Sequence, residues 1–263
     1  MTGDAIDPSD AAAAIETFIA STVDEAGADG AVVGLSGGID SATTSALAAR
    51  ALGPDRVTGM VMPGEPTESH EVEDAERHAD DFDVPTERVP IGGVVDAVRE
   101  ALPDVAGHRE AVGNVRARAR MVLMYAEANV DDLLVLGTGN RTEALIGYFT
   151  KYGDGAVDVL PIGDLYKEEV RAVAREVGVA EDIVEKTPTA GLWEGQTDEG
   201  ELGAPYPVID EILRCLVDEE LSVEATAERT GHDAELVERF RGMYERSAHK
   251  RAMPPAPGVA DRS

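Results

Sequence analysis

The chain has 263 residues, of which 43% are hydrophobic, so it is long enough for one large α/β domain with a substantial core. Its formal net charge of −29 at pH 7 disfavours nucleic acid and anionic membranes as partners. No apolar run approaches the roughly 20 residues that cross a bilayer, and the single Cys215 excludes an intrachain disulfide and a cysteine-based zinc cluster. Because the N-terminus also lacks the order of a signal peptide, we expect one cytoplasmic domain over residues 1–263, with a disordered tail over 254–263.

Acidic residues are in excess along the whole chain, and only four of its 23 basic residues are lysines: Lys151, Lys167, Lys186 and Lys250. This composition resembles that of proteins from organisms with multimolar salt in the cytosol. Screening to a Debye length of about 3 Å at 1 M salt makes such self-repulsion tolerable there. We interpret the charge as an adaptation to a halophilic environment. A lysine retained on this background is therefore a stronger candidate for a chemical role.

Helices and strands alternate through the first half of the chain. The apolar spacing predicts a helix over residues 8–26, a strand over 31–35 and a helix that ends near Gly53. Further strands are expected over 57–62, 86–89 and 132–136, with helices over 68–81, 94–102 and 109–129. Alternation at these spacings predicts an α/β fold, a doubly wound parallel sheet with helices on both faces. In such sheets, ligands bind beyond the carboxyl ends of the strands.

The second half of the chain is less regular. A helical C-terminal segment is expected, with helices over residues 167–177, 207–218, 222–230 and 233–248. Residues 187–205 hold glycines, prolines and acids without apolar periodicity, and such a segment in a compact domain is often a lid. We interpret Trp193 and Tyr206 as packing residues and Cys215 as a buried structural thiol.

The strongest chemical signal lies between the first strand and the following helix, in the loop Gly34-Leu35-Ser36-Gly37-Gly38-Ile39-Asp40-Ser41. Its glycines let backbone N–H groups crowd around an anion, and the helix N-terminus adds a favourable dipole. Its serines supply hydroxyl donors. Asp40 would repel bound phosphates unless a cation lay between them, so it implies Mg²⁺. The pattern is neither a Walker loop nor a Rossmann fingerprint. It resembles the pyrophosphate loop, SGGxDS, of the ATP pyrophosphatases.

A second signal follows the strand over 132–136, in the run Gly137-Thr138-Gly139-Asn140-Arg141-Thr142-Glu143. The strand end and the Gly-Thr turn place a hydroxyl and the carboxylate of Glu143 at the same sheet edge as Asp40. Two carboxylates there could share the ion that bridges ATP phosphates. Taken alone, Glu143 is an ordinary acid in the first turn of a helix. Glu143 becomes a candidate site residue because the glycine loop over 34–41 is predicted at the same sheet edge.

The run GYFTKYGDGAVDVLPIGDLYK, residues 147–167, resembles the signature of the ammonia-dependent NAD synthetases, a family of the N-type ATP pyrophosphatase superfamily. Further similarity lies in GNVRARARM (113–121), KTPTA (186–190), QTDEGELG (196–203) and HKR (249–251), so the likeness covers about residues 10–254 in family order. It implies a fold like that of the adenine nucleotide alpha hydrolases. Asn140 and Arg141 depart from the His-Ala-Ala-Glu type of sequence that is common in the bacterial branch, although Glu143 stays aligned.

The resemblance also implies roles for individual residues. The loop over 34–41 would bind the ATP phosphates, and Asp40 and Glu143 would hold Mg²⁺; with Lys167 they form the expected catalytic set. ATP would also contact Thr138, Lys167 and Thr189. The deamido-NAD substrate would be held by Arg118, Lys151, Asp158, His249 and Lys250. A homodimer is implied as well, with the dinucleotide site near the subunit interface.

The implied activity is that of a ligase, which joins ammonia to deamido-NAD with ATP and gives NAD⁺, AMP and pyrophosphate through an acyl-adenylate. Some relatives take ammonia from glutamine through an added amidohydrolase domain. This chain has no room for one, so free ammonia is the expected nitrogen donor. Water would destroy the adenylate, and ordering of residues 187–205 as a lid would exclude it.

Two alternative interpretations remain. The loop could serve an adenylating enzyme with a different acceptor, such as a tRNA-modifying or GMP-synthetase-like enzyme, although the net charge disfavours tRNA. It could also serve a non-catalytic adenine-nucleotide sensor, which the loss of Asp40 or Glu143 would have favoured. Among the substrate-binding candidates, Arg118 shares its helix with Arg116 and Arg120, so one of these arginines could be a surface residue.

Overall fold

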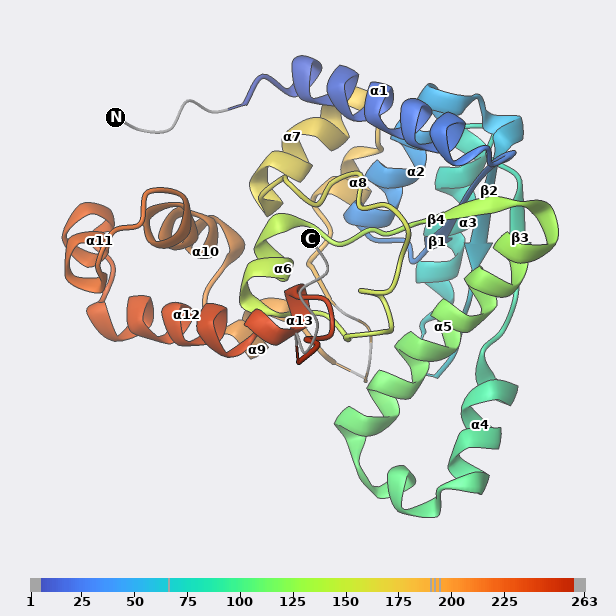
Figure 1. Ribbon diagram of the computed structural model, residues 1–263. Helices are drawn as coiled ribbons and strands as arrows, with labels where there is room; N and C mark the ends of the chain where they lie inside the picture. The colour runs from blue at the N-terminus through green and yellow to red at the C-terminus, as the bar shows by residue number, and fades with distance from the viewer. Residues whose placement is uncertain (1–5, 66, 190, 192, 194, 258–263) are drawn as a thin grey trace.

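The computed structural model describes residues 6–65, 67–189, 191, 193 and 195–257. A parallel sheet lies at its centre (Figure 1), with strands β1 (Gly30–Leu35), β2 (Val57–Val61), β3 (Thr86–Arg88) and β4 (Leu133–Leu136) in the order β3-β2-β1-β4. The chain runs outwards from β1 to β3 and then returns to place β4 on the other side of β1. This reversal confirms the predicted doubly wound sheet and marks the β1–β4 edge as the place where such folds bind ligands.

Helices surround the sheet. Those close to it are α1 (Pro8–Ala26), α2 (Ile39–Leu52), α3 (Ser69–Asp81), α4 (Gly92–Ala101), α5 (Arg109–Asp131) and α7 (Lys167–Val177). Shorter or C-terminal helices are α6 (Arg141–Ile146), α8 (Glu181–Val184), α9 (Asp198–Leu202), α10 (Tyr206–Leu213), α11 (Val223–Thr230), α12 (Ala234–Arg246) and α13 (Ala248–Arg251). None of the described helices combines the length and the apolar character that a bilayer span requires.

The central strand β1 is buried on both faces. Ala31 and Val33 belong to the core that α1, α2 and α7 cover, whereas Val32 belongs to the opposite core, together with Met60 and with Met124 of α5. Because successive side chains of a strand alternate between faces, a strand covered on both sides must be apolar throughout. A further core joins α6, α10, α11 and α12, and this C-terminal helical segment lies beside the sheet (Figure 1).

The predicted and observed elements differ mainly where helices are short. The segment 187–205 contains α9, and α6 and α8 are also single short helices without enough residues for an apolar period. The helix expected over 207–218 is α10 followed by a π-helical turn over Arg214–Asp218, and Cys215 in that turn is buried, as predicted. Residues 254–257 have no regular structure, and the remainder of the predicted disordered tail, 258–263, lies outside the described residues.

A buried histidine predicts how stability depends on pH. His78 of α3 is 2% exposed, its Nε2 lies 2.9 Å from Ser45 Oγ, and burial lowers its pKa to about 4. Between pH 6.5 and 4 the unfolded chain therefore binds a proton that the folded chain excludes. The free energy of unfolding falls as the pH falls through this range, by about 3 kcal/mol from this residue.

Chemical denaturation of the wild type and of His78→Gln at pH 7 and pH 4.5 measures this contribution. The variant should lose less stability over this range than the wild type does. His70→Gln, at an exposed histidine of the same helix, should behave like the wild type. Equal losses in all three proteins would contradict the assignment.

Candidate active site

A cavity of about 670 Å³ opens at the carboxyl ends of β1, β2 and β4. Its walls include the loop over 34–41, Met62, Thr138, Glu143, Lys167 and Lys186. The cavity thus lies at the edge where the strand order reverses, and both glycine-rich runs of the sequence reach it.

The glycine loop arranges backbone donors at one end of this cavity. Gly37 adopts φ +74°, and an added Cβ there would lie 2.3 Å from the carbonyl oxygen of Glu71. The Gly38 N–H donates to Ser36 Oγ at 3.3 Å, and Ser41 Oγ donates to the Gly38 carbonyl at 3.0 Å. Helix α2 begins directly after Gly38, without a side-chain cap on its first N–H groups. The N–H groups in the first turn of α2 and the helix dipole are together suited to bind an anion.

The conformation of Gly37 yields a stability prediction. Gly37→Ala should lower the free energy of unfolding by about 3 kcal/mol, because positive φ disfavours alanine and the Glu71 backbone cannot easily move away. Gly27 ends α1 with a similar φ of +70°, but no atom lies within 4 Å of its added Cβ. Gly27→Ala should therefore lose only about 1 kcal/mol. Urea denaturation measures both variants, and equal losses would contradict the proposed clash.

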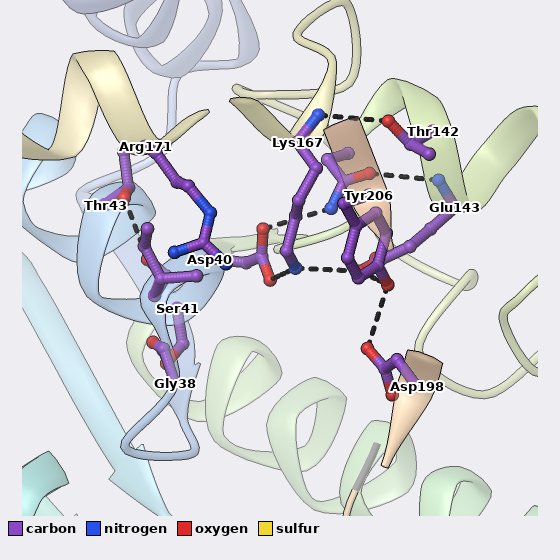
Figure 2. A network of polar contacts seen from close by, with 12 residues as sticks. Gly38, Asp40, Ser41, Thr43, Thr142, Glu143, Lys167, Arg171, Asp198 and Tyr206 are labelled. Carbon is purple, nitrogen blue, oxygen red and sulfur yellow. Dashed lines mark hydrogen bonds and ion pairs between the residues drawn. The ribbon is translucent and has the colours of Figure 1, made fainter. Parts of the chain in front are cut away.

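Three elements that are distant in sequence meet at the side chain of Lys167 (Figure 2). Its Nζ, at the start of α7, lies 2.5 Å from Asp40 Oδ2 in α2 and 3.1 Å from Glu143 Oε1 in α6. The lysine side chain is 2% exposed, and the carboxylates are 19% and 17% exposed. Asn140 Nδ2 donates to the other oxygen of Asp40 at 3.0 Å. The three side chains of the expected catalytic set are therefore in direct contact.

Burial and charge oppose each other in this cluster. Burial alone would lower the pKa of Lys167, but the charges of Asp40 and Glu143 raise it, so the amine stays protonated. Burial raises the pKa of Glu143 by more than the charge of Lys167 lowers it. When both carboxylates are ionised, one ammonium group leaves a net negative charge at the cavity wall, which suits an additional cation.

The donor set at Asp40 and Glu143 fits Mg²⁺. Carboxylate oxygens are the hard ligands that this ion prefers. Within the part of the chain that the structure describes, no group of three or more His, Cys, Asp and Glu side chains could hold a metal ion. Mg²⁺ usually takes one or two carboxylates and completes its shell with phosphate oxygens and water. The pair therefore suits a magnesium ion that arrives with a nucleotide.

Residues near α9 connect the irregular segment to the carboxylate cluster. Tyr206 Oη donates to Asp198 Oδ2 at 2.8 Å and lies 3.4 Å from Glu143 Oε1. Tyr148 Oη donates to Glu201 at 2.7 Å, and Tyr148, Asp198 and Glu201 all line the cavity. Tyr206 packs in the core as predicted, yet its hydroxyl also ties the segment to the site. Residues 187–205 are thus attached beside the cavity at their C-terminal end.

The candidate ATP contacts at the threonines lie on the cavity wall. Thr138 lines the cavity just after β4, and Thr189 lines it from the irregular segment. Thr189 Oγ1 donates to the Gln196 carbonyl at 2.8 Å and accepts the Gly191 N–H at 3.1 Å. This hydroxyl therefore also organises the turn of its own segment.

Four of the five candidate dinucleotide contacts lie next to one another. Arg118 donates to the carbonyl of Lys151 at 3.1 Å, and Lys151 Nζ donates to the carbonyl of His249. Lys250 Nζ donates to the carbonyls of Gly147 and Phe149, both at 2.7 Å.

Asp158, the fifth candidate, has other hydrogen-bond partners. Its carboxylate accepts the Tyr125 hydroxyl at 3.0 Å and the Val135 N–H at 2.8 Å, at the end of β4. Neither partner is indicated by the sequence pattern around Asp158.

Sequence reasoning also missed polar partners of the cluster, namely Asn140, Asp198 and Tyr206. Asn140 is buried, orients Asp40 and caps α6 by accepting the Glu143 N–H at 3.0 Å. An Asn three residues before a Glu is a recognisable helix-cap pattern, so the sequence held this signal. Tyr206 carries no such signal, because a tyrosine next to an apolar helix is usually a core residue.

Comparison with known proteins places these residues in a family context. The NAD synthase family model matches residues 11–254. The chain is 51% identical over 243 residues to the NH(3)-dependent NAD(+) synthetase of Halobacterium salinarum, across 92% of this chain and 91% of that protein. It is 46% identical to the NH(3)-dependent NAD(+) synthetase of Pyrococcus furiosus, across 94% of this chain and 95% of that protein.

Solved structures agree with the sequence relatives. An NMN synthetase from Francisella tularensis superposes with a TM-score of 0.84 at 31% identity, over 97% of this chain and 100% of that one. An NH3-dependent NAD synthetase from Campylobacter jejuni superposes with a TM-score of 0.81 at 31% identity, over 96% of this chain and 99% of that one.

Proposed function

The chain belongs to the NAD synthase family, and we propose that its cavity houses the ligase reaction of that family. The reaction is the ATP-dependent amidation of deamido-NAD with ammonia, which gives NAD⁺, AMP and pyrophosphate and serves NAD biosynthesis. The observation that supports this site best is the meeting of Asp40, Glu143 and Lys167 beside the glycine loop.

The first half-reaction activates a carboxylate. An oxygen of the nicotinate carboxylate attacks the α-phosphorus of ATP, the bond from that phosphorus to the pyrophosphate oxygen breaks, and an acyl-adenylate forms. The backbone N–H groups of the loop and of the α2 N-terminus, together with Lys167, would stabilise the charge that develops on the phosphate oxygens. Thr138 and Thr189 would position ATP from the other walls.

In the second half-reaction, ammonia attacks the activated carbonyl carbon. The carbon–oxygen bond to AMP breaks, and a proton leaves the new amide nitrogen. The chain's contribution here is to hold the adenylate and keep water away from it. We propose that residues 187–205 serve as the lid, since Asp198 and Tyr206 connect this segment to Glu143.

Mg²⁺ held by Asp40, Glu143 and the phosphates would neutralise negative charge and make pyrophosphate a better leaving group. Without the ion, Lys167 offsets part of the charge of the two carboxylates. With the ion bound between the carboxylates, the ammonium group of Lys167 would no longer be needed there and could donate to the phosphate oxygens.

We also propose that Arg118, Lys151, Asp158, His249 and Lys250 contact deamido-NAD at a homodimer interface. In support, all five residues lie on exposed or half-buried surface, and α5 carries exposed apolar residues. Val122, one turn after Arg118, is 53% exposed, and Val130 is 79% exposed. Light scattering should give twice the chain mass of 27.7 kDa, and a fully active monomer would contradict this arrangement.

The test of the function is a product assay in molar KCl with deamido-NAD, ATP, Mg²⁺ and ammonium, with each component omitted in turn. Equal amounts of NAD⁺ and AMP, formed only in the complete mixture, are expected. Because one structural neighbour is named an NMN synthetase, nicotinate mononucleotide is offered in a parallel reaction. AMP formed with the mononucleotide alone would move the assignment to that acceptor, and no AMP with either acceptor would favour a sensor.

A further inference from the structure

Three of the four lysines of this acidic chain line the cavity, namely Lys167, Lys186 and Lys250, and Lys151 directly follows Thr150, which also lines it. Lys151, Lys167 and Lys250 already have parts in the proposed reaction. Lys186 has none so far. It directly precedes the 187–205 segment, and it lines the cavity at the glycine loop.

Lys186 connects the loop to helix α3, and Arg77 connects α3 to α8. Its Nζ donates to the carbonyl oxygen of Gly37 at 3.1 Å and to Asp74 Oδ2 of α3 at 2.7 Å. Arg77 of the same helix also donates to Asp74, at 3.0 Å, and to Asp182 of α8 at 2.6 Å. Lys186 and Asp74 are only 23% and 25% exposed. The ammonium group of Lys186 is therefore held between the Gly37 carbonyl and the Asp74 carboxylate.

The ion pair with Asp74 persists at neutral pH. Burial alone would raise the pKa of Asp74, but hydrogen bonds and charge from Lys186 and Arg77 hold it below its ordinary value. A permanently ionised carboxylate keeps the lysine side chain directed at the loop.

The bond to Gly37 decides which way one peptide group faces. The Gly37 carbonyl and the Gly38 N–H belong to the same planar unit and point in opposite directions. With the carbonyl directed at Lys186, the N–H is turned towards Ser36 Oγ, on the other side. Neither glycine carries a Cβ, so half a turn of this peptide meets little intrinsic resistance. After such a turn, a phosphate bound on that side would face the Gly37 carbonyl oxygen instead of the Gly38 N–H.

We propose that Lys186 is a positioning residue, whose ammonium group holds the Gly37–Gly38 peptide so that the Gly38 N–H faces the pyrophosphate part of ATP. The proposal rests on the phosphate-binding role given above to the glycine loop. Because Lys186 directly precedes the 187–205 segment, it also couples the start of this segment to the loop.

Calorimetric titration of Mg-pyrophosphate and of MgATP into purified full-length protein tests the proposal. Lys186→Met should weaken both complexes about tenfold or more, since a charge-assisted hydrogen bond that fixes a donor is lost. It should raise KM for ATP while leaving KM for ammonium unchanged. Lys186→Arg, which keeps the charge and the donor, should recover most of the affinity. Arg175→Met removes a cation that pairs with Glu181 and Glu185 beside α8 without touching the loop, and it should bind like the wild type.

A purely structural ion pair predicts a different pattern. In that case Asp74→Asn would weaken binding as much as Lys186→Met, because either change removes the pair. Under the proposal, Asp74→Asn leaves the bond to Gly37 and has the smaller effect. Equal effects, or a Lys186→Met protein that is folded by circular dichroism and binds both ligands normally, would overturn it. If the wild type makes NAD⁺ but Lys186→Met binds both ligands normally, the positioning role is wrong and the proposed reaction stands. If Lys186→Met weakens binding but the wild type makes no NAD⁺, the proposed reaction is wrong and the positioning role stands.

Discussion

Lys167→Met is expected to reduce kcat/KM for ATP by about 10³-fold or more. The methionine keeps the volume of the side chain but removes the ammonium group that contacts Asp40 and Glu143. Loss of one preorganised charge at a phosphoryl-transfer site usually has an effect of 10²–10³-fold, as an order of magnitude. Here the two partly buried carboxylates, Asp40 and Glu143, also lose their positively charged partner. Steady-state assays of AMP and NAD⁺ formation measure the change, with Arg175→Met of the same helix as the control for a lost cation.

The same variant should be less stable in the absence of ligands. Removing one side of a buried ion pair leaves an uncompensated charge, and the free energy of unfolding should fall on the order of 3 kcal/mol. Millimolar Mg²⁺ should restore part of this stability, because a cation returns between the carboxylates, but it should not restore turnover. A variant with normal activity would show that Lys167 only balances charge.

Asp40→Asn should be the second most damaging change, with a loss of about 10²–10³-fold in kcat. The amide has nearly the same shape, but it cannot serve as an anionic ligand. It also brings an NH₂ group among the donors Asn140 Nδ2 and Lys167 Nζ, so one contact becomes donor against donor. The Mg²⁺ concentration that gives half-maximal rate should rise. Asp164→Asn, at an exposed acid, controls for the lost charge.

The double variant Asp40→Asn/Lys167→Met separates stability from chemistry. The double variant removes both members of the closer ion pair of this cluster. Its loss of unfolding free energy should therefore be smaller than the sum of the losses in the two single variants. Its turnover should stay as low as that of the worse single variant. Recovery of activity in the double variant would mean that the pair acts only in folding.

The long elements could be predicted well from periodicity, because each presents several apolar turns to a core. Both α1 and α7 have the predicted bounds. The helices α6, α8 and α9 could not be found this way, since four to six residues hold too little of a period. Such helices are formed by caps and tertiary contacts, as Asn140 and Thr197 do for α6 and α9.

The candidate site was only partly accessible to the same reasoning. Sheet topology allowed Asp40 and Glu143 to be placed at one edge, because strand ends converge there. No pattern along the chain reports that Lys167, 127 residues after Asp40, has its amine between the two carboxylates. The hydroxyl of Tyr206 was missed for a similar reason: its bond to Asp198 depends on how the 187–205 segment folds back. The roles of the dinucleotide contacts stay predictions.

The scarcity of lysine has a practical consequence for the chemistry of labelling. Reagents that acylate primary amines find, besides the amino terminus, only Lys151, Lys167, Lys186 and Lys250. Lys167 is shielded, 2% exposed, whereas Lys186 is partly accessible at the loop. Immobilisation or dye attachment through lysine would therefore modify mainly residues that line the cavity, such as Lys186 and Lys250, because the chain has few other amines. Carboxylate-directed coupling, for which 52 acidic side chains compete, would spread the attachment over the whole molecule.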